Sequence, residues 1–201
     1  GPVEKSDRFT ISYVGGFDFS RTPLLVLRAV GELIGEGRLD RHRVTLRFVG
    51  PCQYAGDRSV AEMIAQSGLN GIAEIVGFVP RPEALKEILR ASVLVLLGGT
   101  QRLSVAAKVY EYVAGGKPIL AITEDGATAE LIRRIGGGRV VAPNDLEGAK
   151  DAIASWYEGY VQEGHLGTTH WPHDPGIADE YSWDRLGARY AAVLEECCED
   201  K

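Results

Sequence analysis

Cysteine is scarce in this sequence, and no cysteine stands at a metal-ligand spacing. The 201 residues include three cysteines, Cys52, Cys197 and Cys198, so the number is odd and two of the three are adjacent. This pattern argues against a disulfide framework and favours a reducing compartment, the cytoplasm. Neither a CxxC pair nor a histidine pair at ligand spacing is present, so we expect no structural zinc.

Long apolar runs and an excess of positive charge are also missing. No run approaches the roughly 18–20 apolar residues that a membrane-spanning helix needs, and the first residues do not form a signal peptide. The formal net charge of −6 argues against a general nucleic-acid-binding surface. With 45% hydrophobic and 25% charged residues, the composition is that of a globular protein with a sizeable core.

Two familiar nucleotide-binding motifs are absent as well. GxxxxGK[ST] does not occur, so a nucleoside triphosphatase of that kind is weakly supported. GxGxxG does not follow the first predicted strand, so the sequence does not support a dinucleotide site of the usual kind.

A regular alternation of strand and helix patterns is present. Strands are predicted at 9–14, 44–49, 73–79, 93–97, 117–123 and 139–142, and helices at 23–36, 59–67, 82–91, 104–114, 128–135, 146–161 and about 182–198. Strict alternation predicts an α/β fold. We expect a single doubly wound, Rossmann-like domain with a six-stranded parallel sheet and helices on both faces.

The domain is expected to run from residue 9 to residue 201. Residues 1–8 are polar and are interpreted as a disordered leader or an artificial extension. Because a strand begins almost immediately after them, the pattern suggests a domain cut from a longer protein.

In a doubly wound sheet, ligands bind at the carboxyl ends of the strands, near the point where the strand order reverses. Gly15 and Gly16 end the first predicted strand and lead to Arg21, a pattern that suits an anion held by backbone N–H groups and a guanidinium. A tight turn with a solvated arginine is the alternative. Val79 follows the third strand, where its backbone either faces a planar base or forms a plain turn.

The fourth predicted strand is followed by Gly98 and Gly99 and then by a predicted helix from Ser104. The free N–H groups of a helix start favour anions, and Lys108 and Glu111 share one face of this helix. We interpret Lys108 as a phosphate ligand and Glu111 as the acceptor for ribose hydroxyls. The alternative is an exposed ion pair that contributes only about 0.2–0.5 kcal/mol.

Several segments, in order and over nearly the whole chain, resemble those of one enzyme family. They are "YVGGFDFSR", "LRFVGP", "AEIVGFVP", "KVYEYVAGGKPILAI" and "YSWDRLGARYAAVL". The chain resembles the C-terminal, nucleotide-sugar-binding half of GT-B glycosyltransferases, most closely the retaining enzymes of family 4, or group 1. The segment "YEYVAGGKPILA" is the most specific of these and stands for that family's EAMAxGxPV.

The resemblance implies donor-site roles residue by residue. Glu111 matches the second glutamate of the family's EX7E motif, which binds the donor ribose, and Arg21 matches a lysine that contacts the diphosphate. The backbone amides of Ala106 and Ala107 would meet the diphosphate at a helix start. Val79, Ser104 and Lys108 come from the pattern of residues at the strand ends and not from the family motif. The predicted donor-binding set is thus Gly15, Gly16, Arg21, Val79, Ser104, Ala106, Ala107, Lys108 and Glu111.

Two positions depart from the family pattern. Leu103 stands where the first glutamate of EX7E would be, and Gly16 stands where the family has an arginine. One carboxylate near the transferred sugar and one cation near the diphosphate are thus absent. Our hypothesis is that Lys108 replaces the lost positive charge.

The resemblance implies a full-length enzyme that transfers a sugar from a nucleotide-diphosphate sugar to a glycan, lipid or small molecule, as in polysaccharide biosynthesis. UDP is slightly favoured over GDP as the nucleotide, and no metal ion is expected. An N-terminal GT-B domain would supply the acceptor site, the catalytic groups and any peripheral membrane contact, so this chain alone would be inactive.

Two other functions stay open. A non-catalytic, GT-B-like binding or interaction module would explain Leu103 and Gly16. A sugar-nucleotide epimerase of GT-B type would need acids and a histidine at the strand ends, and the sequence offers none there.

Overall fold

The computed structural model describes residues 7–99 and 102–162, together with nine single positions between 180 and 195. Positions 180, 184, 185, 187, 188, 190, 191, 192 and 195 are helical, in the region of the last predicted helix. The other residues of that helix, and residues 1–6 of the predicted leader, lie outside the described residues.

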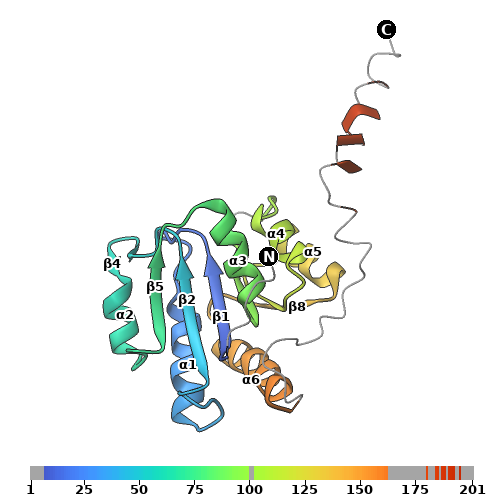
Figure 1. Ribbon diagram of the computed structural model, residues 1–201. Helices are drawn as coiled ribbons and strands as arrows, with labels where there is room; N and C mark the ends of the chain where they lie inside the picture. Colours follow the sequence, from blue (N-terminus) through green and yellow to red (C-terminus); the bar gives the residue numbers. More distant parts are fainter. Residues whose placement is uncertain are drawn as a thin grey trace.

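Six parallel strands form the central sheet in the order β5-β2-β1-β6-β7-β8 (Figure 1). Their bounds are β1 Phe9–Val14, β2 Val44–Val49, β5 Ala73–Gly77, β6 Val93–Leu97, β7 Ile119–Ile122 and β8 Gly138–Val141. The chain moves outward from β1 in one direction and then restarts at β6 in the other. The predicted doubly wound α/β fold with a six-stranded parallel sheet is therefore confirmed.

Helices cover both faces of the sheet (Figure 1). Their bounds are α1 Leu24–Gly35, α2 Val60–Gln66, α3 Arg81–Arg90, α4 Lys108–Ala114, α5 Ala127–Ile135 and α6 Leu146–Gln162. One hydrophobic core joins α1, α2 and α6 to the sheet, and a second joins α3, α4 and α5 to its other face. Because β6 lies between the two cores, all five of its residues are buried, as its unbroken apolar sequence predicts.

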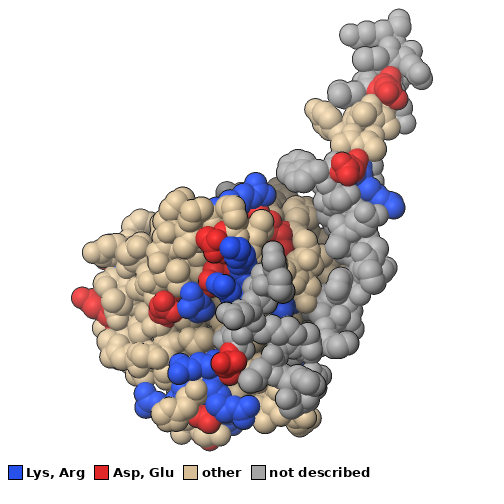
Figure 2. Space-filling model, in the orientation of Figure 1, with Lys and Arg blue, Asp and Glu red and all other residues tan. Residues whose placement is uncertain are grey.

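Charged side chains are mixed over the face that carries α3 (Figure 2). Arg47 on β2 pairs with Glu74 on β5 and with the buried Glu87 on α3, and Glu87 also accepts from Arg90. This network ties α3 to strands β2 and β5. Opposite charges thus neutralise one another on this face instead of forming a patch of one sign.

At three places the local structure differs from the predicted elements. A hairpin of two short strands, β3 Tyr54–Ala55 and β4 Arg58–Ser59, was not predicted, because two-residue strands leave no periodic pattern. The third predicted strand ends at Gly77, whose φ of 83° turns the chain away before Val79. The fourth predicted helix begins at Lys108 and not at Ser104, for a reason given below.

Candidate functional site

The strand order reverses between β1 and β6, and there the two strands separate early. Strand β1 pairs with β2 over all six of its residues. With β6 it pairs only at Ile11↔Val93 and Ser12↔Leu94. The carboxyl ends of the two strands therefore part, and the loops that follow them border a crevice, the usual place for a ligand in this architecture.

A cleft of about 360 Å³ occupies this place. Asp18, Ser20 and Arg21 line it from the loop after β1. Leu97, Gly98, Gly99, Ser104 and Ala106 line it from the end of β6 and the following loop. Three residues predicted for the donor site, Arg21, Ser104 and Ala106, thus lie around one cavity.

Arg21 is held in place by Asp18. Its Nη2 and Nε donate to Asp18 Oδ2 at 2.6 and 2.9 Å, and Asp18 Oδ1 accepts from the backbone N–H groups of Ser20 and Arg21. These bonds, led by the Arg21 guanidinium, hold the pKa of Asp18 well below its usual range. The pairing fixes the direction of Arg21 and offsets part of its charge.

Lys108 reaches across to the end of β1. A Cβ placed on Gly15 would lie 3.0 Å from Cε of Lys108, so the lysine stem passes directly over the glycine. Among the residues that the structure describes, no carboxylate forms an ion pair with Lys108. A cation without a counter-charge, above a glycine turn at a strand end, is suited to a phosphate.

The backbone of the Gly15–Gly16 turn is fixed from three sides. Gly15 N–H donates to the carbonyl of Val49, the Cys52 thiol donates to the Gly15 carbonyl at 3.2 Å, and the Tyr13 hydroxyl donates to the Gly16 carbonyl at 2.7 Å. Burial raises the pKa of Cys52 to about 12, so this thiol stays protonated and able to donate. The turn is therefore shaped before any ligand arrives.

Glu111 lies on α4 beside the start of α3. Its carboxylate is 3.5 Å from Nη2 of Arg81, and the glutamate side chain is 35% exposed. Arg81 begins α3, which follows β5, and Glu111 lies on α4, which follows β6. The Arg81–Glu111 pair therefore connects the segments that follow these two strands. Sequence analysis missed Arg81; its only signal was a cation directly after Val79 and Pro80, where a base-facing backbone and a plain turn were both left open. Val79 itself is half-buried against the second core.

Residues 102–107 are tied to the start of α5. Ala106 N–H donates to Thr128 Oγ1, this hydroxyl donates to the carbonyl of Ser104, and Ala127 N–H donates to the carbonyl of Arg102. These backbone groups are used by α5 and not by a helical turn, which is why α4 begins later than predicted. The Ala106 amide, assigned from the resemblance to a diphosphate, thus has an internal partner.

The carboxyl edge of the sheet also exposes large apolar side chains. Phe19, Tyr54, Phe78 and Leu103 follow β1, β2, β5 and β6 in turn and are all exposed. Leu103, at the position of the missing glutamate, is 98% exposed. Exposed apolar residues at one edge of a sheet are typical of a surface that meets another molecule or domain.

These features define a class of protein: a doubly wound α/β domain with a crevice at its switch point that Arg21 lines. The chain belongs to the family glycosyl transferases group 1, whose model matches residues 8–158. The predicted resemblance is therefore confirmed. Among the described residues, no helix is long and apolar enough to cross a bilayer.

One curated relative is the D-inositol 3-phosphate glycosyltransferase of Gordonia bronchialis. It is 27% identical over 183 residues, which make up 87% of this chain and 37% of the relative. The chain thus spans little more than a third of that relative's length.

Solved structures with the same fold include the following two. Anabaena HepE in complex with UDP-glucose has a TM-score of 0.71 at 15% identity, covering 94% of this chain and 49% of HepE. Sucrose-phosphate synthase from Thermosynechococcus elongatus has a TM-score of 0.72 at 16% identity, covering 97% of this chain and 47% of the synthase. At these identities the similarity shows the fold alone.

Proposed function

We propose that this chain is the donor-binding half of a glycosyltransferase that uses a nucleotide-diphosphate sugar. The observation that carries the proposal is that Lys108 passes over Gly15 at the end of β1, Arg21 lies beside Gly99 after β6, and Glu111 stands one helical turn beyond Lys108. Cations followed by a carboxylate match the order of diphosphate and ribose in a nucleotide.

In the reaction, the bond between the anomeric carbon and the diphosphate oxygen breaks, and its electron pair leaves with the diphosphate. A bond forms between that carbon and an acceptor hydroxyl, whose proton passes to a base or to the departing diphosphate. Lys108 and Arg21 act on the charge that develops on the diphosphate, where fixed cations lower the barrier most. Glu111 accepts hydrogen bonds from the ribose hydroxyls.

Several finer assignments belong to this proposal. Retention of the anomeric configuration is suggested by the family resemblance. UDP is favoured over GDP, with support from the solved relative that carries UDP-glucose. Side-chain cations take the place of a metal ion at the diphosphate. A buried free thiol, Cys52, agrees with a reducing compartment such as the cytoplasm.

A second domain of the whole protein would complete the enzyme. The chain covers 37% of its curated relative and about half of the solved ones. The exposed residues Phe19, Tyr54, Phe78 and Leu103 follow strands at the carboxyl edge of the sheet, the edge over which such a domain would close. That domain would bring the acceptor site and the remaining catalytic groups.

Calorimetry on the whole protein with UDP, GDP and ADP tests the proposal. We expect saturable binding, about ten-fold weaker in Lys108→Ala and in Glu111→Ala, because each removes a hydrogen bond to a charged group. Lys86→Ala is the matched control, since Lys86 is a surface lysine already paired with Glu83 on α3. Folded wild-type protein that binds none of the three nucleotides would overturn the proposal.

A non-catalytic module is the second candidate, and Leu103 is the observation that favours it. An aliphatic side chain that is 98% exposed cannot hydrogen-bond to a sugar where the family has a carboxylate. Turnover separates the two functions: the enzyme releases nucleoside diphosphate from its donor when an acceptor is present, whereas the module binds without release.

A further inference from the structure

The backbone at the end of β1 lacks a strand partner on one side. Thr10, Ser12 and Val14 direct their peptide groups toward β6, as the bond from Ser92 N–H to the carbonyl of Thr10 shows. Gly15 N–H points the other way, to Val49 on β2. Since β1 and β6 pair no further than Ser12↔Leu94, the N–H and C=O of Val14 meet no strand on the β6 side.

The hydroxyl of Tyr112 fills this position. It accepts from Val14 N–H at 3.0 Å and lies 3.5 Å from the Val14 carbonyl, to which it donates. Tyr112 comes from α4 and is fully buried. Burial raises the pKa of Tyr112, so the hydroxyl remains protonated and keeps both roles. One side chain thus replaces the missing strand at the point where the sheet divides.

The position of Tyr112 links the two parts of the candidate site. On α4 it follows Glu111 directly and stands one turn after Lys108. On β1 its partner Val14 directly precedes Gly15, over which Lys108 passes. A shift of β1 relative to α4 would change the distance between the glycine turn and both charged side chains.

We propose that Tyr112 is a positioning residue of the donor site, whose hydroxyl fixes the end of β1 against α4. This inference rests on the proposed function for its effect on binding, but its structural part can be tested without a ligand. The hydroxyl sets the spacing between the diphosphate contacts at Gly15 and Lys108 and the ribose contact at Glu111.

Tyr112→Phe in the whole protein tests the inference, because it removes the hydroxyl and keeps the buried ring. Ser92→Ala is the matched control: Ser92 Oγ accepts from Thr10 N–H at 3.1 Å, so the same strand loses a similar bond at its opposite end. Three quantities are measured in each variant: the melting temperature, amide hydrogen exchange in residues 13–17, and the affinity for UDP or GDP.

We expect both variants to fold and to lose a similar amount of thermal stability. Exchange in residues 13–17 should become at least about ten-fold faster in Tyr112→Phe only, since Val14 N–H loses its buried acceptor. The affinity for the nucleoside diphosphate should fall about five-fold in Tyr112→Phe, the size expected for one hydrogen bond acting through position, and should not change in Ser92→Ala.

Unchanged exchange in Tyr112→Phe would overturn the inference, as would an equal loss of affinity in both variants. Failure of Tyr112→Phe to fold would overturn it too, because the hydroxyl would then be needed for the fold itself. If the wild-type protein binds no nucleotide, the proposed function fails, and the exchange comparison still decides whether Tyr112 fixes β1.

Discussion

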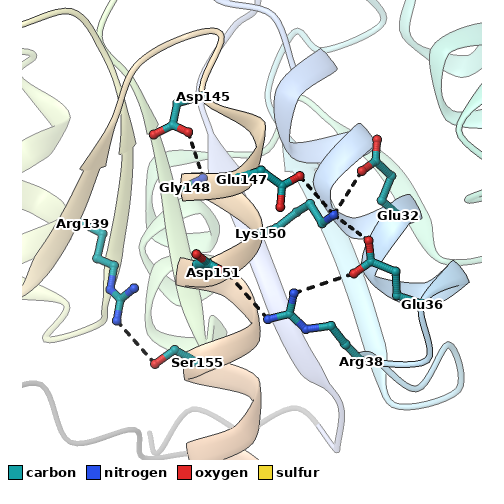
Figure 3. Close-up of polar contacts among 10 residues, drawn as sticks. All are labelled: Glu32, Glu36, Arg38, Arg139, Asp145, Glu147, Gly148, Lys150, Asp151 and Ser155. Carbon is teal, nitrogen blue, oxygen red and sulfur yellow. Dashed lines mark hydrogen bonds and ion pairs between the residues drawn. The ribbon is translucent and has the colours of Figure 1, made fainter.

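Lys150 and Lys108 show how differently one residue type is used at two places in this fold. At the α1–α6 junction, Lys150 Nζ lies 3.2 Å from Glu32, 2.6 Å from Glu36 and 3.2 Å from Glu147, and its side chain is 6% exposed (Figure 3). At the carboxyl edge, Lys108 passes over Gly15 and forms no ion pair with any described carboxylate.

Lys150 carries a charge that stabilises the fold, whereas the charge of Lys108 is available to a ligand. Lys150 joins two helices that lie next to each other on one face of the sheet, and its charge is more than matched by its neighbours. No carboxylate in the described part of the chain pairs with Lys108, so its positive charge at the end of β1 is available to an anionic ligand. The surroundings of a cation, more than its burial, thus distinguish the two regions.

The largest effect is expected from Gly50→Ala, which alters the carboxyl edge. Gly50 has φ 119°, and a Cβ there would meet the carbonyl oxygen of Gly15 at 2.2 Å. We expect the free energy of unfolding, measured in urea, to fall by about 2–3 kcal/mol, because backbone strain at positive φ adds to the clash with the Gly15 carbonyl.

Gly35→Ala near the α1–α6 junction is the matched substitution. Gly35 ends α1, and beyond its chain neighbours and the backbone of its own helix no atom lies within 4 Å of its Cβ position. We expect Gly35→Ala to raise the free energy of unfolding by about 0.5–1 kcal/mol, because alanine favours the helix. Equal free-energy changes in the two variants would show that the edge is no more constrained than the junction.

Exchanging each lysine for methionine sharpens the comparison directly. Lys150→Met should lower the melting temperature by several degrees, since Glu32, Glu36 and Glu147 lose the charge between them, with nucleotide affinity unchanged. Lys108→Met should do the opposite: affinity for a nucleoside diphosphate falls about ten-fold, while the melting temperature hardly moves. A common response of both properties in both variants would abolish the distinction between the two lysines.

The pH dependence of stability should reflect the Lys150–Glu36 ion pair at the α1–α6 junction. Lys150 lowers the pKa of Glu36 below its ordinary value of 4.5, so the unfolded state binds more protons near that pH. The contribution of Glu36 is complete above about pH 4.5 and is lost as the pH falls through the lower, folded value.

Unfolding midpoints between pH 3 and 7 measure this effect. The acid loss should be steeper in the wild type than in Lys150→Met, where the pKa of Glu36 returns toward its ordinary range. The carboxyl-edge variant Lys108→Met serves as the control and should keep the wild-type slope. A slope unaffected by Lys150→Met would show that Glu36 does not depend on this lysine.

The smallest effect is expected at Cys52, beneath the glycine turn. Because burial raises its pKa to about 12, the thiol should not react with iodoacetamide at pH 8 in the folded protein. Peptide mapping should detect the label on Cys52 only after unfolding in urea. Labelling of the native protein at the rate of a free thiol would mean that the edge opens far more than the site geometry implies.

Much of the fold could be predicted from the sequence because its signals are local. Strands β1, β2 and β6 have the predicted bounds, since each is rich in β-branched, aliphatic or aromatic residues and is followed directly by glycine. The strict alternation with helices leaves few topologies, and the doubly wound sheet is the one observed. The hairpin β3–β4 was not predicted, because strands of two residues are too short to show an alternating pattern.

The candidate site could be predicted only in part. Glycine-rich strand ends and the Lys108–Glu111 spacing located the edge and the helix that carry it. The late start of α4 could not be foreseen, because it depends on Thr128 accepting and donating across 22 to 24 residues. The Glu111–Arg81 pair joins residues 30 apart, and no local pattern records such a contact.

The sequence by itself determined the order of elements, the parallel sheet and the edge at which a ligand would bind, because periodicity and glycine placement act over a few neighbouring residues. Only the tertiary structure decided which charges are matched and which are free. Lys150 and Lys108 are alike in the sequence, but the first gains three carboxylates from two helices, whereas the second stands over a glycine where two strands part. Electrostatic pairing depends on distances between segments far apart in the chain, and folding sets those distances.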